Sequence, residues 1–168
     1  MGLCCSKSTS VISVSLKDVS TATNNLPEFS FEGLSTWARC VDVYDGDTCK
    51  VVFIYDGKLI KCTVRMVGYD APEMRTVYAL EKDQAIKCKD TLIRLTKLNQ
   101  VYDVSNPKRN LIYIRIGKFD KYGRMLATIF ENDITTNDYD HSINCQIMNM
   151  PGCHPYNGGT KTWANDYK

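Results

Sequence analysis

Two apolar runs separated by an Asp-Gly pair constrain the fold of this chain more than any other feature. Residues 51–55 and 59–65 are rich in apolar and β-branched side chains, and Asp56-Gly57 lies between them. Such a pair favours a β-hairpin, because both residues tolerate the positive φ angles of a two-residue turn. From residue 34 onward, further short apolar runs alternate with turn residues. This spacing is typical of an all-β barrel rather than of alternating strands and helices.

Between residues 79 and 98 the period changes from that of a strand to that of a helix. Apolar residues recur there at helical spacing and predict a buried stripe made of Ala85, Cys88, Leu92 and Leu95. Strand character returns in residues 101–104, 111–117 and 125–130. A short second helix over residues 142–150 is expected to end before Pro151. With about five strands, one major amphipathic helix and a short second helix, the expected fold is an α+β five-stranded OB-fold barrel.

The 168-residue chain is long enough for one domain with its own core. We expect a flexible leader over residues 1–33, the folded domain over residues 34–160 and a frayed tail over residues 161–168. The net charge of +2 attracts a polyanion only weakly, so any contact with nucleic acid has to come from a local cluster. No feature of the sequence identifies a protein partner, and we expect a monomer.

The eight cysteines contain no C-x-x-C pair and follow no secretory signal. We therefore expect them to be mostly reduced and the protein not to be secreted. Four residues near the end of the chain could be drawn together as a zinc site: His141, Cys145, Cys153 and His154. Their spacing fits no usual pattern of zinc ligands, so chance clustering is the preferred interpretation.

The chain begins with a pattern typical of lipid modification. The string MGLCCS at residues 1–6 satisfies the myristoylation motif, in which removal of Met1 frees Gly2 for the acyl chain. One myristoyl chain binds membranes marginally, and palmitate on Cys4 and Cys5 would supply the second signal that stable anchoring needs. The expected location is the cytosolic face of a cellular membrane, foremost the plasma membrane, in a eukaryotic or virus-infected cell. The alternative is a disordered leader that happens to begin with glycine and cysteines.

Three short strings carry the residue types that phosphodiester hydrolysis needs: DGDT at residues 45–48, RMVGYDAPE at residues 65–73 and DKYGR at residues 120–124. The predicted hairpin can bring the carboxylates of Asp45, Asp47 and Asp70 together, and crowded like charges favour a bound divalent cation. Each string alone also fits an ordinary turn or a surface ion pair. Their combination favours a metal-dependent phosphodiesterase.

The second string supplies a candidate base and a candidate phosphate ligand. Glu73 follows Ala71-Pro72, and the proline stiffens the backbone so that the carboxylate can project toward a metal-bound water. Arg65 lies in an apolar strand and needs an anionic partner, which is either the acidic cluster or a phosphate.

The third string supplies candidate contacts to nucleic acid. Arg124 follows a glycine turn and can take phosphate oxygens bidentately. Beside it, Lys121 can hold a flanking phosphate, and Tyr122 can stack on a base or hydrogen-bond with the nucleotide.

The three strings, in this order, resemble the staphylococcal nuclease (thermonuclease) family over roughly residues 37–159. The resemblance implies an OB-fold enzyme that hydrolyses DNA and RNA with one calcium ion and leaves 3′-phosphates. It implies metal-site residues, which are Asp47, Asp70, the backbone oxygen of Ala71 and, in support of these, Asp45. It also implies three catalytic residues: Glu73 to orient or deprotonate the attacking water, and Arg65 and Arg124 to bind the scissile phosphate. The proton donor to the leaving 5′-oxygen stays open between Arg124 and solvent.

Two other functions compete with the nuclease. Some relatives of this domain keep the barrel, lose the carboxylates and bind nucleic acid or protein, so a catalytically weak binding module at a membrane is the main alternative. The presence of Asp47, Asp70 and Glu73 favours the nuclease over that module. A membrane adaptor, in which the acylated leader is the function and the barrel only a scaffold, is the third possibility.

Overall fold

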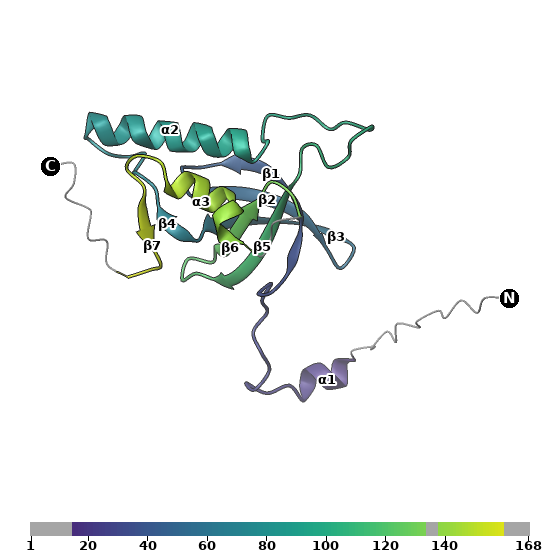
Figure 1. Cartoon of the computed structure of the whole chain (residues 1–168). Helices are drawn as coiled ribbons and strands as arrows, with labels where there is room; N and C mark the ends of the chain where they lie inside the picture. Colours follow the sequence, from purple (N-terminus) through teal and green to yellow (C-terminus); the bar gives the residue numbers. More distant parts are fainter. Residues whose placement is uncertain (1–14, 134–137, 160–168) are drawn as a thin grey trace.

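In the computed structural model of the chain, which describes residues 15–133 and 138–159, five strands close a barrel (Figure 1). The strands are β1 (Ser35–Val43), β2 (Thr48–Tyr55), β3 (Lys58–Met66), β5 (Ile112–Phe119) and β6 (Met125–Phe130). The order around the barrel is β1-β2-β3-β6-β5. All neighbouring strands pair antiparallel except β3 and β6, which are parallel. The predicted α+β fold with a five-stranded OB-type barrel is confirmed.

The predicted hairpin joins β2 to β3. Asp56 and Gly57 have φ angles of 48° and 70°, and Tyr55 pairs with Lys58 across the turn. Two consecutive positive φ angles match the right-handed twist of the flanking strands, so this turn sets the register of the whole hairpin. The register places Thr48, at the start of β2, opposite Arg65, near the end of β3. The first two candidate strings are therefore neighbours.

The major helix, α2 (Ala79–Leu95), lies along one side of the barrel (Figure 1). Its buried residues are the predicted four, Ala85, Cys88, Leu92 and Leu95. The helix ends before the predicted residue 98, because Thr96 leaves the helical conformation and its hydroxyl donates to the Leu92 carbonyl at 2.6 Å. Apolar spacing thus identified the buried face, although not the last turn.

The short elements flank this helix and one end of the barrel. The predicted second helix is confirmed as α3 (Ile143–Met148), where the Ser142 side chain accepts from the Cys145 backbone N–H at 3.0 Å. A two-stranded sheet of β4 (Gly68–Asp70) and β7 (His154–Tyr156) was not expected. Each of its strands has only three residues, too few to show an alternating pattern.

The strand predicted over residues 101–104 is wrong. Val101 and Val104 are 77% and 81% exposed, and the structure assigns no strand there. Asp103 instead makes a turn, accepting from the Ser105 N–H at 2.9 Å. The carbonyl of Gln100, just before this segment, accepts from the Arg39 guanidinium at 2.8 Å, so the chain is held to β1 by a side chain and not by a strand ladder. The barrel takes β1 as its fifth strand.

The core extends into the predicted leader. Phe31 is only 6% exposed, and its ring lies edge-on to Phe53 and Tyr55 at centroid distances of 5.3 and 5.0 Å. Upstream of it, α1 (Leu16–Ser20) has no buried residue and lies apart from the barrel (Figure 1). None of the helices within the described residues is long and apolar enough to cross a bilayer.

Candidate functional site

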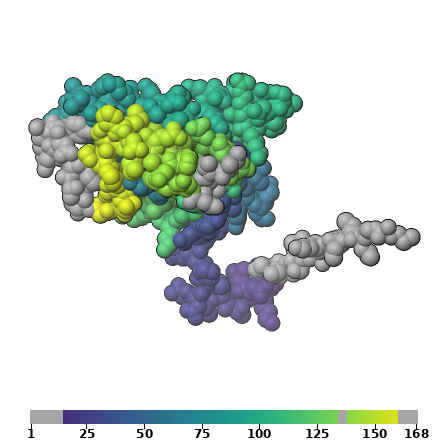
Figure 2. Space-filling view, viewed as in Figure 1, coloured from purple at the N-terminus to yellow at the C-terminus, as the bar shows by residue number. Residues whose placement is uncertain are grey.

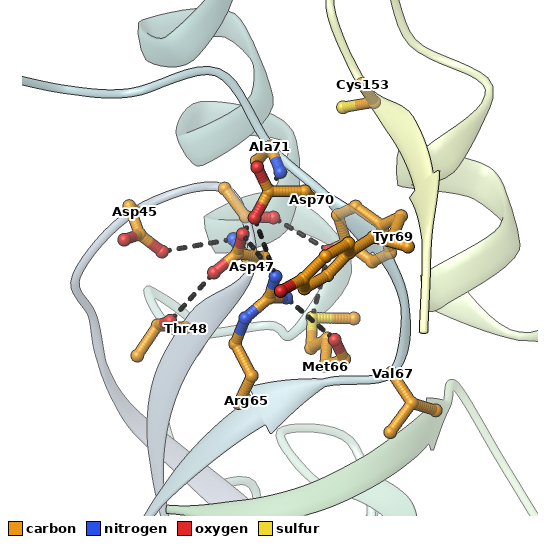
Figure 3. Close-up of polar contacts among 12 residues, drawn as sticks. Asp45, Asp47, Thr48, Arg65, Met66, Val67, Tyr69, Asp70, Ala71 and Cys153 are labelled. Atoms are coloured by element: carbon orange, nitrogen blue, oxygen red, sulfur yellow. Dashed lines mark hydrogen bonds and ion pairs between the residues drawn. The ribbon is translucent and has the colours of Figure 1, made fainter. Parts of the chain in front are cut away.

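Asp47 of the first string and Asp70 of the second meet around Arg65 at the edge of the barrel (Figure 3). Asp47 immediately precedes β2, Arg65 lies in β3, and Asp70 ends β4. The main chain joins these segments directly, because the Met66 N–H donates to the Asp47 carbonyl at 2.8 Å. The structure therefore brings together residues that the sequence proposed as a site.

Arg65 bridges two carboxylates. Its Nη2 lies 3.2 Å from Asp47 Oδ2 and 2.9 Å from Asp70 Oδ1, and its Nη1 donates to the Met66 carbonyl at 2.8 Å. All three charged groups are at most 8% exposed. The acidic cluster is thus the anionic partner that a buried arginine required. One guanidinium faces two carboxylates. The charge of the cluster is therefore not balanced, and a further cation would balance it.

Asp47 is held through both of its oxygens. Oδ1 accepts from the Thr48 hydroxyl at 2.8 Å, and Oδ2 accepts from the Ala71 backbone N–H at 3.1 Å. Burial raises the pKa of Asp47 to about 7, although the nearby Arg65 charge opposes the rise, and the Asp45 charge adds to it. The carboxylate is held in position, but its negative charge is only partly neutralised by its surroundings. A bound divalent cation would neutralise the rest.

Asp45 and Tyr69 hold the loop that presents Asp47. Asp45 Oδ1 accepts from the Asp47 N–H at 3.1 Å, and its support of a metal site stays a prediction. The wholly buried Tyr69 donates its hydroxyl to the Gly46 carbonyl at 2.8 Å. Sequence analysis missed Tyr69. Its position inside the second string was the only available signal, and nothing local indicates that its hydroxyl reaches a loop 23 residues away.

Only glycine fits at position 46 of that loop, for steric reasons. A Cβ atom on it would lie 2.7 Å from Cys88 Cβ in α2 and 2.8 Å from Ala71 Cβ. Both distances are below any normal carbon–carbon contact, so only glycine lets the loop pack this close to α2. The position of Asp47 thus depends on tight packing between the loop, the helix and the Ala71 segment.

Ala71 and Glu73 differ in their exposure to solvent. Ala71 is buried, and its N–H rather than its carbonyl makes the contact to Asp47. Glu73 is exposed, and its backbone N–H donates to Glu81 Oε1 in the first turn of α2 at 3.2 Å. The backbone oxygen of Ala71 as a ligand and the Glu73 carboxylate as a base remain predictions.

Arg124 is held by its own turn. Asp120 Oδ2 accepts from Arg124 Nε at 2.7 Å, and Oδ1 accepts from the backbone N–H groups of Tyr122 and Arg124, each at 2.9 Å. Partial burial raises the pKa of Asp120, but these hydrogen bonds outweigh it and leave the pKa lowered. The Arg124 side chain remains 31% exposed, so it can reach a ligand at the surface.

The strand register relates Arg124 to Arg65. The parallel pairing of β3 with β6 aligns Val64 with Met125 and Arg65 with Leu126. Arg124 therefore lies level with Thr63, about 7 Å along the strand direction from Arg65. Val64, Met66 and Met125 point into the core, so alternation puts both arginines on the outer face of the barrel wall. The two predicted phosphate ligands share one face.

Lys121 and Tyr122 lie in the turn that precedes Arg124. Tyr122 is 72% exposed. The Lys121 Nζ lies 5.1 Å from the centre of its ring and the Arg124 Cζ 5.4 Å. An exposed aromatic ring with two cations near it suits a nucleotide base with a neighbouring phosphate.

A hard cation fits the donor set better than zinc does. The groups that converge on Arg65 are carboxylates and backbone groups, with the oxygen chemistry that calcium prefers. Within residues 15–133 and 138–159, no group of three or more His, Cys, Asp or Glu side chains is arranged to hold a metal ion.

Three of the four residues considered as zinc ligands, His141, Cys153 and His154, have other neighbours. His141 Nδ1 lies 2.8 Å from Asp138 Oδ2, and Cys153 Sγ lies 3.4 Å from Cys88 Sγ. His154 pairs with Asp70 in the small sheet. Chance clustering in the sequence remains the better interpretation.

A scan against protein-family models and a search of curated proteins found no match.

Proposed function

We propose that this chain is a calcium-dependent endonuclease that hydrolyses phosphodiester bonds of DNA and RNA to 3′-phosphate products. The observation that supports it best is the buried trio of Asp47, Arg65 and Asp70, in which two carboxylates share one guanidinium. A purely structural ion pair gains most when its charges balance. An excess of buried negative charge beside an arginine-bearing surface is better suited to a site for a cation and a phosphate.

Asp47 and Asp70 would hold the ion, together with the backbone oxygen of Ala71. When bound, calcium polarises the phosphate and helps to present the attacking water. Arg65 can turn from the carboxylates toward a phosphate oxygen once a cation shares their charge, because its Nη2 group makes both carboxylate contacts. Arg65 would then stabilise the charge of the five-coordinate phosphorus.

Glu73 and Arg124 would complete the chemistry from the surface. Glu73 lies two residues beyond Ala71, so its carboxylate can take a proton from water at the rim of the site. Arg124 exchanges one side-chain bond to Asp120 for phosphate oxygens, and its partial exposure keeps the cost of that exchange small. Lys121 and Tyr122 would hold the flanking nucleotide.

The test is cleavage of single-stranded and double-stranded DNA and of RNA by the full chain in calcium, in magnesium and in a chelator. We expect cleavage in calcium only, reduced about 10²–10⁴-fold in Glu73→Gln and about 10²–10³-fold in Arg124→Ala. End-group analysis of the products should show 3′-phosphates.

Matched controls separate chemistry from folding. Glu28→Gln changes another exposed glutamate, and Arg109→Ala removes an exposed arginine that pairs with Asp103 at 3.1 Å, much as Arg124 pairs with Asp120. Both controls should cleave at the wild-type rate. Wild-type rates in folded Glu73→Gln and Arg124→Ala proteins would exclude the mechanism.

A binding module is the second candidate, and the Tyr122 surface favours it specifically. Its exposed ring and two flanking cations can bind a nucleotide without any metal. This candidate predicts nucleic-acid binding that persists in chelator, is lost in Tyr122→Ala and is accompanied by no cleavage in any metal.

Membrane attachment through Gly2, Cys4 and Cys5 is a separate proposal, and these residues lie outside the part of the chain that the structure describes. It rests on the coincidence of a myristoylation motif with two adjacent cysteines. A Gly2→Ala protein expressed in eukaryotic cells should move from the membrane to the soluble fraction. If it stays with the membranes, acylation at Gly2 is not the anchor. An adaptor without catalytic function predicts no phenotype from Glu73→Gln in the same cells.

A further inference from the structure

Two thiols from distant parts of the chain face one another beside the carboxylate cluster. Cys88 lies in α2 and Cys153 just before β7, 65 residues apart, and their Sγ atoms are 3.4 Å apart. Figure 2 shows the yellow segment that carries β7 on the surface next to the teal α2. Neither thiol has a part in the proposed hydrolysis.

The two cysteines differ in access. Cys88 has no exposed surface, whereas Cys153 is partly exposed. A second close thiol pair, Cys40 with Cys49 in the barrel interior, has no exposed surface on either member. Of these two pairs, only Cys88–Cys153 has a member, Cys153, that a small reagent can reach.

We propose that Cys88 and Cys153 form a reversible disulfide, made by exchange with a small disulfide of the glutathione class, that links β7 to α2. A disulfide bond is about 2.05 Å long, so the two sulfur atoms have to approach by only about 1.4 Å. Cys153 directly follows a turn at Gly152, whose φ is 81°, and a small change in that turn can absorb the movement. The cytosolic location expected for this chain makes such a bond reversible rather than permanent.

The exchange proceeds in two steps. The hydrogen bond between the two thiols lowers the pKa of Cys88 and raises that of Cys153, but Cys88 has no exposed surface, so access decides the order. The Cys153 thiolate attacks one sulfur of oxidised glutathione, forms a mixed disulfide and releases one reduced glutathione. The Cys88 thiolate then attacks the Cys153 sulfur and releases the second. In sum, two protein thiols lose two electrons and two protons, and one oxidised glutathione becomes two reduced molecules.

The disulfide would connect the two segments that pack against the candidate metal ligands Asp47 and Asp70. Cys88 backs the loop at Gly46, next to Asp47, and Cys153 adjoins His154, which pairs with Asp70 across the small sheet. The proposal does not depend on hydrolysis, because the disulfide and its order of formation are measured without any substrate.

The test uses the full reduced chain equilibrated in glutathione buffers, then acid-quenched, alkylated and mapped by mass spectrometry. We expect a Cys88–Cys153 linked peptide, reversed by dithiothreitol, and a thermal midpoint several degrees above that of the reduced protein. In Cys88→Ser, one glutathione should accumulate on Cys153. In Cys153→Ser, Cys88 should stay unmodified.

A Cys62→Ser/Cys145→Ser double variant is the matched control, because it removes two other partly exposed thiols. It should form the linked peptide as the wild type does. A wild-type chain in which Cys153 carries glutathione while Cys88 stays reduced would overturn the proposal. Pairing of Cys153 with any other cysteine would overturn it too, and both outcomes are read on the wild type, whose folding is not in question.

Discussion

At the scale of single residues, Arg65 determines both the stability and the chemistry of the carboxylate cluster. Its guanidinium lies 3.2 Å from the Asp47 carboxylate and 2.9 Å from that of Asp70, and the three residues are almost wholly buried. A buried carboxylate without a partner is costly, whereas a balanced pair is nearly neutral. The residue that would bind phosphate in the complex is therefore also the one that keeps the metal-free cluster folded.

Replacement of Arg65 by alanine should destabilise the metal-free protein by about 3–5 kcal/mol, since it removes the guanidinium that two buried carboxylates share. Calcium should stabilise this variant at least as much as it stabilises the wild type, because the ion meets more uncompensated negative charge. Urea unfolding in chelator and in calcium measures both effects. Arg109→Ala, at an exposed pair, should change little. If Arg65→Ala lowers the free energy of unfolding only slightly in chelator, the Arg65 charge does not stabilise the two carboxylates.

Asp47 should make the stability of the metal-free protein depend on pH. Burial raises its folded-state pKa to about 7, against about 3.9 in an unfolded chain. The folded state therefore holds this proton more tightly than the unfolded state. The contribution of this proton to the free energy of unfolding is fully present below about pH 4 and is lost as the pH rises through 7. In urea titrations in chelator between pH 4 and 8, wild-type stability should fall with pH more steeply than that of Asp47→Asn. Parallel curves would contradict this assignment.

At the scale of elements, α2 positions the site from behind. Its Cys88 turn packs against the Gly46 loop, and its Glu81 carboxylate accepts from the Glu73 backbone N–H. The two ends of the second string are thus held by the barrel at Arg65 and by the helix at Glu73. A shift of α2 would move the loop that carries Asp47.

A methyl group at Gly46 tests this packing. Gly46→Ala should cost about 1–3 kcal/mol of unfolding free energy, because the new Cβ meets two carbon atoms that belong to different elements. It should also weaken calcium binding by displacing Asp47. Gly117→Ala is the comparison, since the nearest atom there, the Leu126 carbonyl oxygen, lies at 3.3 Å and the expected cost is smaller. Equal effects of the two changes would show that the loop can move away from α2 freely.

At the scale of the whole molecule, two polar side chains hold the helices to the barrel. Arg39 in β1 donates to four carbonyls that follow α2 or precede β5: those of Lys97, Leu98, Gln100 and Asn110, all within 2.9 Å. Asn144 in α3 is wholly buried and bonds to the Ile129 N–H and to the carbonyls of Val67 and Ala127. These contacts replace backbone ladders where strands end.

Loss of the Asn144 amide should therefore lower the free energy of unfolding substantially. Asn144→Ala removes the acceptor of the Ile129 N–H and the donor to the carbonyls of Val67 and Ala127, with an expected cost of about 2–4 kcal/mol. The control is Asn149→Ala, one turn further along, where the amide is exposed and donates to the Cys145 carbonyl at 3.0 Å. Thermal or urea unfolding compares the two. A similar small effect for both would mean that water replaces the Asn144 contacts.

Local signals determined a large part of this structure. The positive φ angles that Asp56 and Gly57 tolerate produced the hairpin and its register, and the apolar spacing of α2 identified its buried face. The candidate site was predictable as well, because the hairpin register alone brings residues 47 and 65 together. These features depend on interactions between residues close in sequence.

Tertiary contacts decided the rest. Residues 101–104 have the side chains of a strand, yet the neighbouring carbonyls bond to Arg39, a residue 58–71 positions from its partners. The sharing of Arg65 by two carboxylates, the reach of Tyr69 to the Gly46 loop and the meeting of Cys88 with Cys153 likewise join distant segments. Sequence patterns report what each segment prefers. Buried polar groups need hydrogen-bond partners, and the closed barrel places these partners beside them from distant segments. The partners are therefore determined only when the whole chain packs.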